Sequence, residues 1–159
     1  MKKFSAQFIF TNTGPALKRG IITAGDDGTI ISVVDTGGYL GEEEGVEFYN
    51  GIIIPGFVNC HCHLELSYLK GIIPHGTGLA EFISLIRTSG GAGSEYVKPP
   101  ALRADNEMYN EGISLCADIC NTDSTFDIKK KSRIKYINLL EVFGIDPRKA
   151  IHRLDEILK

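Results

Sequence analysis

The sequence predicts an α/β fold in two parts, a small β-sandwich-like N-terminal subdomain over residues 1–50 and alternating strands and helices over residues 51–159. Short β-branched runs separated by Gly and Asp turns predict the first part. Apolar strands that alternate with helical spacing predict the second part, and such βα units imply a parallel sheet. The 18 glycines among the 159 residues suit a chain with many tight turns.

Composition and charge exclude several classes of protein. With 43% apolar and 23% charged residues, the chain is that of an ordinary globular protein and not of a disordered one. A formal charge of −3 leaves no basic footprint, so no nucleic-acid partner is expected. No apolar run reaches the roughly 18 residues of a membrane span, so no membrane partner is expected either. The apolar N-terminal stretch is interrupted at Gln7, which argues against a signal peptide. Four cysteines in a chain of this length do not indicate a disulfide-rich secreted protein, so we expect a cytoplasmic protein.

The first part is expected to consist of short strands and turns. Alternating aromatic and polar residues predict a strand over residues 4–10. Two β-branched runs, 20–23 and 28–34, are joined by Gly-Asp-Asp-Gly and predict a hairpin. The three glutamates at 42–44 are expected to form a solvated loop.

The second part is expected to begin with a buried strand. Residues 52–61 form a nearly continuous apolar run, typical of a strand buried on both faces, with Pro55 at a bend or at the strand start. Helical spacing predicts a helix around residues 79–86, and a Gly-, Ser- and Pro-rich loop is expected over 89–100.

The rest of the chain continues the alternation. A helix is expected over residues 101–111, stopped by Gly112, followed by strands over 113–120 and 134–143. A closing helix is expected over 147–159, with Asp146 as its N-cap.

Two histidines at the end of the first strand of this part are the centre of the chemistry. His61 and His63 are separated by one residue, so in an extended strand their side chains share one side. Two imidazoles there can converge on one divalent metal ion. They fall at the carboxyl end of the strand, where parallel βα folds carry their active sites. Two surface or hydrogen-bonded histidines remain the alternative interpretation of this pair.

Residues 54–64, Ile-Pro-Gly-Phe-Val-Asn-Cys-His-Cys-His-Leu, resemble the first barrel strand of the amidohydrolase superfamily, in particular its cytosine-deaminase and chlorohydrolase-like members. Residues 112–119 resemble the second barrel strand, and Leu-Glu-Leu-Ser at 64–67 resembles deaminases of aminofutalosine-like nucleosides. The resemblance implies that residues 51–159 form the first three βα units of a TIM-type (β/α)₈ barrel. The barrel is incomplete in this chain, because a whole one takes roughly 250 residues.

The resemblance also implies a reaction. In this family a divalent metal, zinc or iron, binds the two histidines together with ligands from later strands, and His61 and His63 are the corresponding ligands here. A metal-activated water then attacks the substrate carbon. The implied function is that of a metal-dependent hydrolase acting on non-peptide carbon–nitrogen bonds, with a deaminase of a purine-, pyrimidine- or aminofutalosine-like substrate as one option. This chain alone lacks the full set of ligands.

Five further residues are candidates for the site. Glu65 shares the parity of the two histidines, and Glu141 lies near the end of the third strand, so both are candidate catalytic residues. Asp118 and Asn121 at the end of the second strand and His75 in the loop after the first are candidate contacts to a small-molecule substrate. Each of the five can instead cap or hydrogen-bond a loop, or face solvent.

Two alternatives to the hydrolase remain. The first is an inactive, truncated barrel fragment, whose open sheet edge and uncovered apolar faces would favour self-association or a missing C-terminal barrel portion as partner. The second is a small structural zinc protein that uses Cys60, Cys62, Cys116 and Cys120. Strand alternation turns the first two thiols away from the imidazoles, and we expect all four to be small buried apolar residues.

Overall fold

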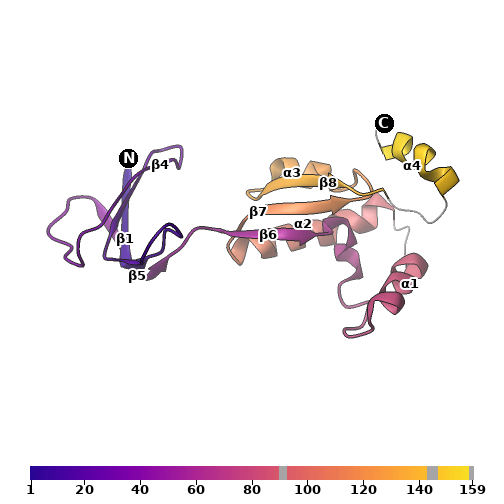
Figure 1. The fold of residues 1–159 in the computed structure, drawn as a ribbon, viewed down its shortest axis with the longest axis horizontal. Coiled ribbons are helices and arrows are strands. Elements are labelled where there is room, and N and C mark those ends of the chain that lie inside the picture. Colours follow the sequence, from indigo (N-terminus) through magenta and orange to yellow (C-terminus); the bar gives the residue numbers. More distant parts are fainter. Residues whose placement is uncertain (90–92, 143–146, 158–159) are drawn as a thin grey trace. The chain divides into compact units, whose positions relative to one another are not determined.

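A computed structural model describes residues 1–89, 93–142 and 147–157 and confirms an α/β fold (Figure 1). The chain divides into two compact units, Met1–Pro55 and Gly56–Lys159. Each unit has its own sheet, mixed in the first and parallel in the second. No helix in the described ranges is long and apolar enough to cross a membrane.

The first unit is a five-stranded sheet built around its first strand. Its strands are β1 (Lys2–Ile9), β2 (Leu17–Lys18), β3 (Ile21–Ala24), β4 (Ile30–Val34) and β5 (Val46–Ile53). One edge of β1 pairs antiparallel with β3 and β2, and the other edge pairs in parallel with β5. The predicted hairpin between β3 and β4 is confirmed, and Gly28 adopts φ +84° in its turn.

The apolar run 52–61 is not one strand, as the sequence predicts, but parts of two. β5 ends at Ile53 and pairs with β1, whereas β6 (Phe57–Cys62) belongs to the second sheet. The break falls at Pro55, which has no N–H to donate to a ladder. At Gly56 an added Cβ would lie 2.6 Å from Ser114 Cβ, so only glycine fits unstrained beside the neighbouring strand.

The second unit contains the predicted parallel sheet, in the order β6-β7-β8. Between β6 and β7 (Ile113–Cys120) lie the 3₁₀ helix η1 (Leu64–Leu69), α1 (Leu79–Ser89) and α2 (Ser94–Asn110). Between β7 and β8 (Lys135–Leu140) lies α3 (Phe126–Lys131), a short helix that the sequence analysis does not predict. The segment after β8 contains η2 (Pro147–Lys149) and α4 (Ala150–Ile157).

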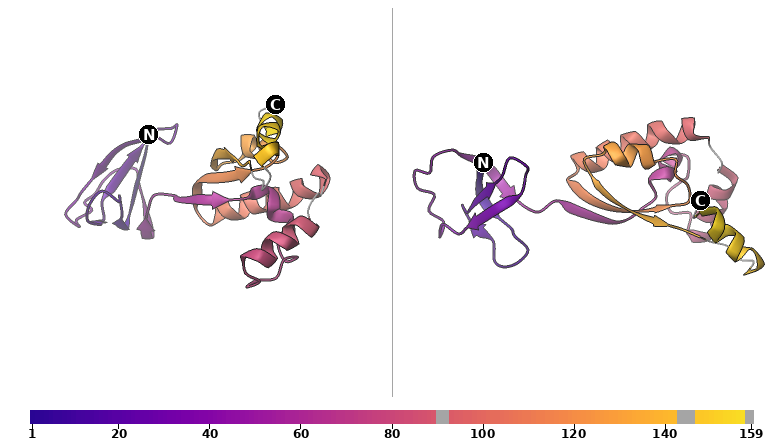
Figure 2. Two further views of the ribbon diagram at one scale, coloured as in Figure 1. Left: turned by 45° about the vertical axis from the view of Figure 1, so that its right-hand side comes forward. Right: turned by 90° about the horizontal axis from the view of Figure 1, so that it is seen from above.

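One face of the parallel sheet is covered by helices and the other is open. Figure 2 shows α2 and α3 lying along the same side of the three strands. On that side Tyr136 of β8 donates a hydrogen bond to Asp105 of α2, 2.8 Å away. On the other side Ile137 and Leu139 are 52% and 46% exposed. The burial on both faces that the sequence predicts for residues 52–61 is wrong, because the consecutive residues Phe57 and Val58 are 53% and 54% exposed.

Helix α2 begins earlier than predicted. It starts at Ser94 and runs through Pro99 and Pro100, which the sequence places in a loop. Val97 and Ala101 of this helix are buried, and their packing offsets the two hydrogen bonds that the prolines cannot make. The predicted end is confirmed, because Gly112 takes φ +88° and donates its N–H to the Tyr109 carbonyl at 3.0 Å.

The last two predicted elements are described only in part, because residues 143–146 and 158–159 lie outside the described ranges. The strand expected over 134–143 is observed as Lys135–Leu140. The helix expected over 147–159 is described as a 3₁₀ turn followed by α4, which ends at Ile157. Asp146, its expected N-cap, lies outside the described residues.

Candidate active site

The two histidines at the carboxyl end of β6 lie side by side. The His61 and His63 ring centroids are 5.2 Å apart, with 66° between the ring planes. Between them, Cys62 hydrogen-bonds with the fully buried Cys116 on the helix-covered side of the sheet, and this bond and burial raise the pKa of Cys62. Because neighbouring side chains of a strand alternate, both imidazoles turn toward the open side.

The polar atoms around the pair show a place for a ligand. The Nδ1 atom of His63 is buried and has no hydrogen-bond partner among the described residues. Buried polar atoms are nearly always bonded, so an orphaned imidazole nitrogen points to a missing partner. Two imidazole nitrogens suit zinc or iron(II), which the resemblance implies. The pair therefore fits a divalent metal ion.

The described residues supply only part of a metal site. They contain no group of three or more His, Cys, Asp or Glu side chains placed to hold a metal ion. A catalytic zinc has three protein ligands, so His61 and His63 require at least one more. The four cysteines are all free thiols, and only Cys116 and Cys120 are buried. The expectation that all four are buried is thus wrong for the exposed Cys60 and the half-buried Cys62.

Glu65 binds the loop that follows β7. Its side chain is buried in η1, and its Oε1 accepts the Asn121 backbone N–H at 2.9 Å. Its Oε2 accepts both the N–H and the hydroxyl of Thr122, at 3.1 and 2.7 Å. Three bonds to one carboxylate hold the two loops together, and the catalytic role of Glu65 stays a prediction.

Two other predicted residues join the same chain of contacts. The Asn121 side-chain amide donates to Glu141 Oε2 at 3.0 Å and to the Glu141 carbonyl at 3.3 Å. The Glu141 N–H in turn donates to the Cys120 carbonyl at 2.9 Å. Three of the residues singled out from the sequence, Glu65, Asn121 and Glu141, thus meet at the carboxyl edge of the parallel sheet.

Asp118 lies on the helix-covered side of the sheet, where its side chain is buried. Its Oδ1 accepts the Leu64 N–H at 2.7 Å, and its Oδ2 forms an ion pair with Lys129 of α3. Both side chains are buried, so Asp118 does not present its carboxylate to a substrate, contrary to the expectation from the sequence. Burial lowers the pKa of Lys129, but the hydrogen bonds and charge of Asp118 and Cys120 outweigh it, and the pKa lies above its ordinary value.

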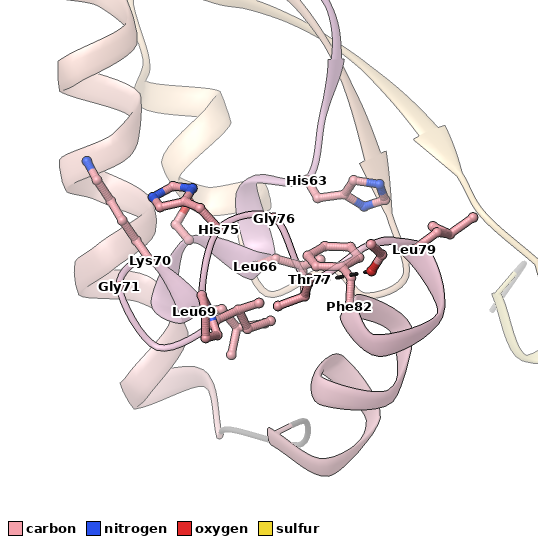
Figure 3. Close-up of a pocket in the computed structure, with 14 residues that line it drawn as sticks. His63, Leu66, Leu69, Lys70, Gly71, His75, Gly76, Thr77, Leu79 and Phe82 are labelled. Atoms are coloured by element: carbon pink, nitrogen blue, oxygen red, sulfur yellow. Dashed lines mark hydrogen bonds between the residues drawn. The ribbon is translucent and has the colours of Figure 1, made fainter.

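A cavity of about 790 Å³ adjoins His63. It is lined by η1, the loop after it and the start of α1, with apolar side chains from Leu66, Leu69, Leu79 and Phe82. Figure 3 shows the His63 ring on one side, near Leu79 and Phe82, and His75 beside Lys70 on the other. His75 therefore reaches the same cavity as His63, although it is exposed and its substrate contact stays a prediction.

Sequence reasoning misses several residues around this site. Phe82 stands in the helical spacing of residues 79–86, which carries no sign of a cavity, and Leu66 enters the sequence analysis only through the resemblance of residues 64–67. Thr122, which makes two of the bonds to Glu65, has no sequence signal at all. Lys129 stands in a run of three lysines, which is typical of a solvated helix face.

Comparisons with known proteins agree with this geometry. No family model matches the chain. A curated 5-methylthioadenosine/S-adenosylhomocysteine deaminase of Haloarcula marismortui is 35% identical over 52 residues, which are 33% of this chain and 12% of that protein.

Solved structures match over nearly the whole chain. The aminofutalosine deaminase of Helicobacter pylori, in complex with methylthio-coformycin, matches 99% of the chain with a TM-score of 0.81 and 19% identity. The guanine deaminase of C. acetobutylicum, with bound guanine, matches 98% with a TM-score of 0.70 and 19% identity. The atrazine chlorohydrolase of Arthrobacter aurescens, complexed with zinc and atraton, matches 93% with a TM-score of 0.68 and 18% identity.

These matches define the class of fold. The chain has the fold of the corresponding part of these two deaminases and this chlorohydrolase, as the resemblance carried by residues 54–64 predicts. It spans 39%, 42% and 37% of the length of those three structures.

Proposed function

We propose that this chain forms the first three βα units of a TIM-type barrel in a metal-dependent hydrolase that cleaves non-peptide carbon–nitrogen bonds, as a deaminase does when it removes an exocyclic amino group. The observation that carries the proposal is the imidazole pair at the carboxyl end of β6, with the His63 Nδ1 buried and unpartnered. The deaminases among the structural neighbours support it.

The residues of the chain have distinct parts in this proposal. His61 and His63 hold the divalent ion, zinc or iron, with further ligands from outside the described residues. A bound ion supplies a water that is acidic enough to act as a nucleophile near neutral pH. Leu66, Leu79 and Phe82 provide an apolar wall beside His63. A flat heterocycle that packs against this wall is removed from solvent. His75 at the far side of the cavity contacts the polar end of such a substrate.

The carboxyl edge of the sheet organises the site. Glu65 and Asn121 fix the loops after β6 and β7 to each other and to Glu141. Glu141 is only half-buried at that edge, and we retain it as the candidate acid–base residue.

The open face of the parallel sheet requires a partner in this proposal. Ile137 and Leu139 expose apolar surface there, and further barrel strands or a second copy of the chain would cover it. We expect size-exclusion chromatography to show self-association of the 159-residue chain. A monomer at all concentrations would contradict the second-copy form of this expectation.

Metal analysis tests the proposal. The chain and its His61→Ala and His63→Ala variants are purified without chelators, and bound zinc and iron are measured by mass spectrometry. We expect each histidine variant to lose the metal, and Cys60→Ala, an exposed neighbour of the pair, to keep it. Loss of metal only in cysteine variants would favour a structural zinc site instead.

Ammonia release tests the reaction itself. Aminofutalosine, 5′-methylthioadenosine, S-adenosylhomocysteine and guanine are the substrates to examine first, since the similar proteins are named for them. Release that depends on the metal and on His63 supports a deaminase. A sample without metal and without ammonia release would favour the inactive fragment.

A further inference from the structure

A buried ion pair lies behind the two histidines, on the helix-covered side of the sheet. Asp118 of β7 and Lys129 of α3 are paired there, and their side chains are 1% and 4% exposed. Neither side chain lines the cavity beside His63. A buried ion pair is weak evidence for stability, because desolvation of both charges offsets much of their attraction. Its presence therefore calls for another explanation.

The surroundings of Lys129 fix the orientation of this pair. Besides Asp118, the Lys129 ammonium donates to Asn138 Oδ1 at 2.9 Å and to the Cys120 sulfur at 3.0 Å. A lysine ammonium has three donors, and all three have partners here. The Asp118 carboxylate cannot rotate away without leaving a buried cation unpaired, which is strongly unfavourable.

The other oxygen of Asp118 holds the backbone next to His63. Asp118 Oδ1 accepts the N–H of Leu64 at 2.7 Å, and Leu64 is the residue that directly follows His63. Leu64 is itself buried, so water does not compete for this N–H. A short hydrogen bond from a buried amide to a fixed carboxylate restricts the peptide on which the His63 side chain is mounted.

The geometry points to Asp118 as a positioning residue for the metal ligand His63, with Lys129 holding Asp118 in place. This inference rests on the proposed function, because it takes His63 as a metal ligand. Asp118 acts through the chain neighbours of His63, since it accepts the Leu64 N–H and also interacts with the Cys62 thiol. Outer groups of this kind orient a ligand, and their loss typically weakens metal affinity about 10–100-fold.

Two double variants separate positioning from stability. Asp118→Asn with Lys129→Met removes both charges but keeps an oxygen that can accept the Leu64 N–H. Its amide NH₂ can donate to the Cys120 sulfur, which lies 3.5 Å from Asp118 Oδ2. Asp118→Leu with Lys129→Met has the same number of side-chain atoms at both positions and no acceptor. The two variants therefore differ in the polar group that position 118 offers to the Leu64 N–H and to the Cys62 and Cys120 thiols, and exchange of the Leu64 amide reports on the first of these.

Zinc affinity and amide exchange are measured in the full chain. We expect the asparagine variant to bind zinc within about threefold of the unchanged chain, and the leucine variant to bind about 10–100-fold more weakly. Hydrogen exchange of the Leu64 amide should be about tenfold faster or more in the leucine variant. Urea unfolding verifies that both variants are folded, and Asp118→Ala replaces Asp118→Leu if the larger side chain does not fold.

The outcomes distinguish this inference from the proposed function. Equal zinc affinities and equal Leu64 exchange in the two folded variants would overturn the positioning role. If the unchanged chain binds no zinc, the proposed function fails. The Leu64 exchange rates then still decide whether Asp118 holds this peptide.

Discussion

The carboxylate of Glu65 is expected to be one of the larger single contributions to the stability of the second unit. It accepts three hydrogen bonds at 2.7–3.1 Å from Asn121 and Thr122. Hydrogen bonds to a charged group contribute about 1.5–3 kcal/mol each, but these three share one carboxylate and Thr122 is exposed to water. We therefore expect Glu65→Ala to lower the free energy of unfolding by about 3 kcal/mol, and the Tm by about 6–12 °C.

The matched control for Glu65 is an exposed glutamate. Glu107 pairs with Lys70 at 2.6 Å, but both side chains are more than half exposed, so Glu107→Ala should change the unfolding free energy by less than about 1 kcal/mol. Urea unfolding followed by circular dichroism measures both variants, and Glu65→Gln, which keeps one acceptor oxygen, should fall between them. A loss of less than about 0.5 kcal/mol in Glu65→Ala would refute the view that this carboxylate holds the loop after β7.

Three further outcomes follow from the fold. Gly56→Ala should destabilise the second unit by about 1–3 kcal/mol, because the new Cβ would lie 2.6 Å from Ser114 Cβ, and adding Ser114→Gly should recover part of that loss in urea unfolding. The free energy of unfolding should fall as the pH rises above 9.0, the ordinary pKa of a cysteine. Burial raises the pKa of Cys120 and of Tyr136. Burial lowers the pKa of Lys129, but its hydrogen bonds with Asp118 and Cys120 outweigh burial and raise it. Since the unfolded chain releases these protons first, the urea midpoint should be lower at pH 10 than at pH 7, and an unchanged midpoint would contradict the assignment. Chelation of bound metal should leave the circular dichroism spectrum unchanged, because Asp118 and Glu65 hold the end of β6 that carries the two histidines. A loss of helical signal would show that the metal is needed for the fold.

Sequence patterns predict the elements that are determined by residues close together in the chain. The hairpin between β3 and β4 follows from its Gly-Asp-Asp-Gly turn, and the end of α2 follows from Gly112. The place of the histidines at a strand end follows from the apolar run before them. In each case the deciding residues are adjacent in sequence, so no distant contact is needed.

Elements that depend on distant contacts are not predicted. The division of residues 52–61 between two sheets is decided by the pairing of β5 with β1 and by the approach of Gly56 to Ser114. The early start of α2 depends on the burial of Val97 and Ala101 against other elements. Apolar run length alone cannot distinguish these arrangements.

The candidate site shows the same division. Strand alternation places His61 and His63 together, but the position of Asp118 at a strand end does not reveal its ion pair with Lys129. Alternation also cannot reveal that one lysine of three consecutive lysines is buried, since that depends on the carboxylate of a separate strand.

The parallel pairing of β1 with β5 has a consequence for synthesis. Lys3 pairs with Val46 and Ile9 with Ile53, so one edge of β1 has no partner until β5 has left the ribosome. The β3–β4 hairpin and β2 can dock on the other edge while the nascent chain waits. The first sheet is therefore completed only shortly before β6 emerges from the ribosome, and until then the open edge of β1 is a site at which a chaperone would protect the chain.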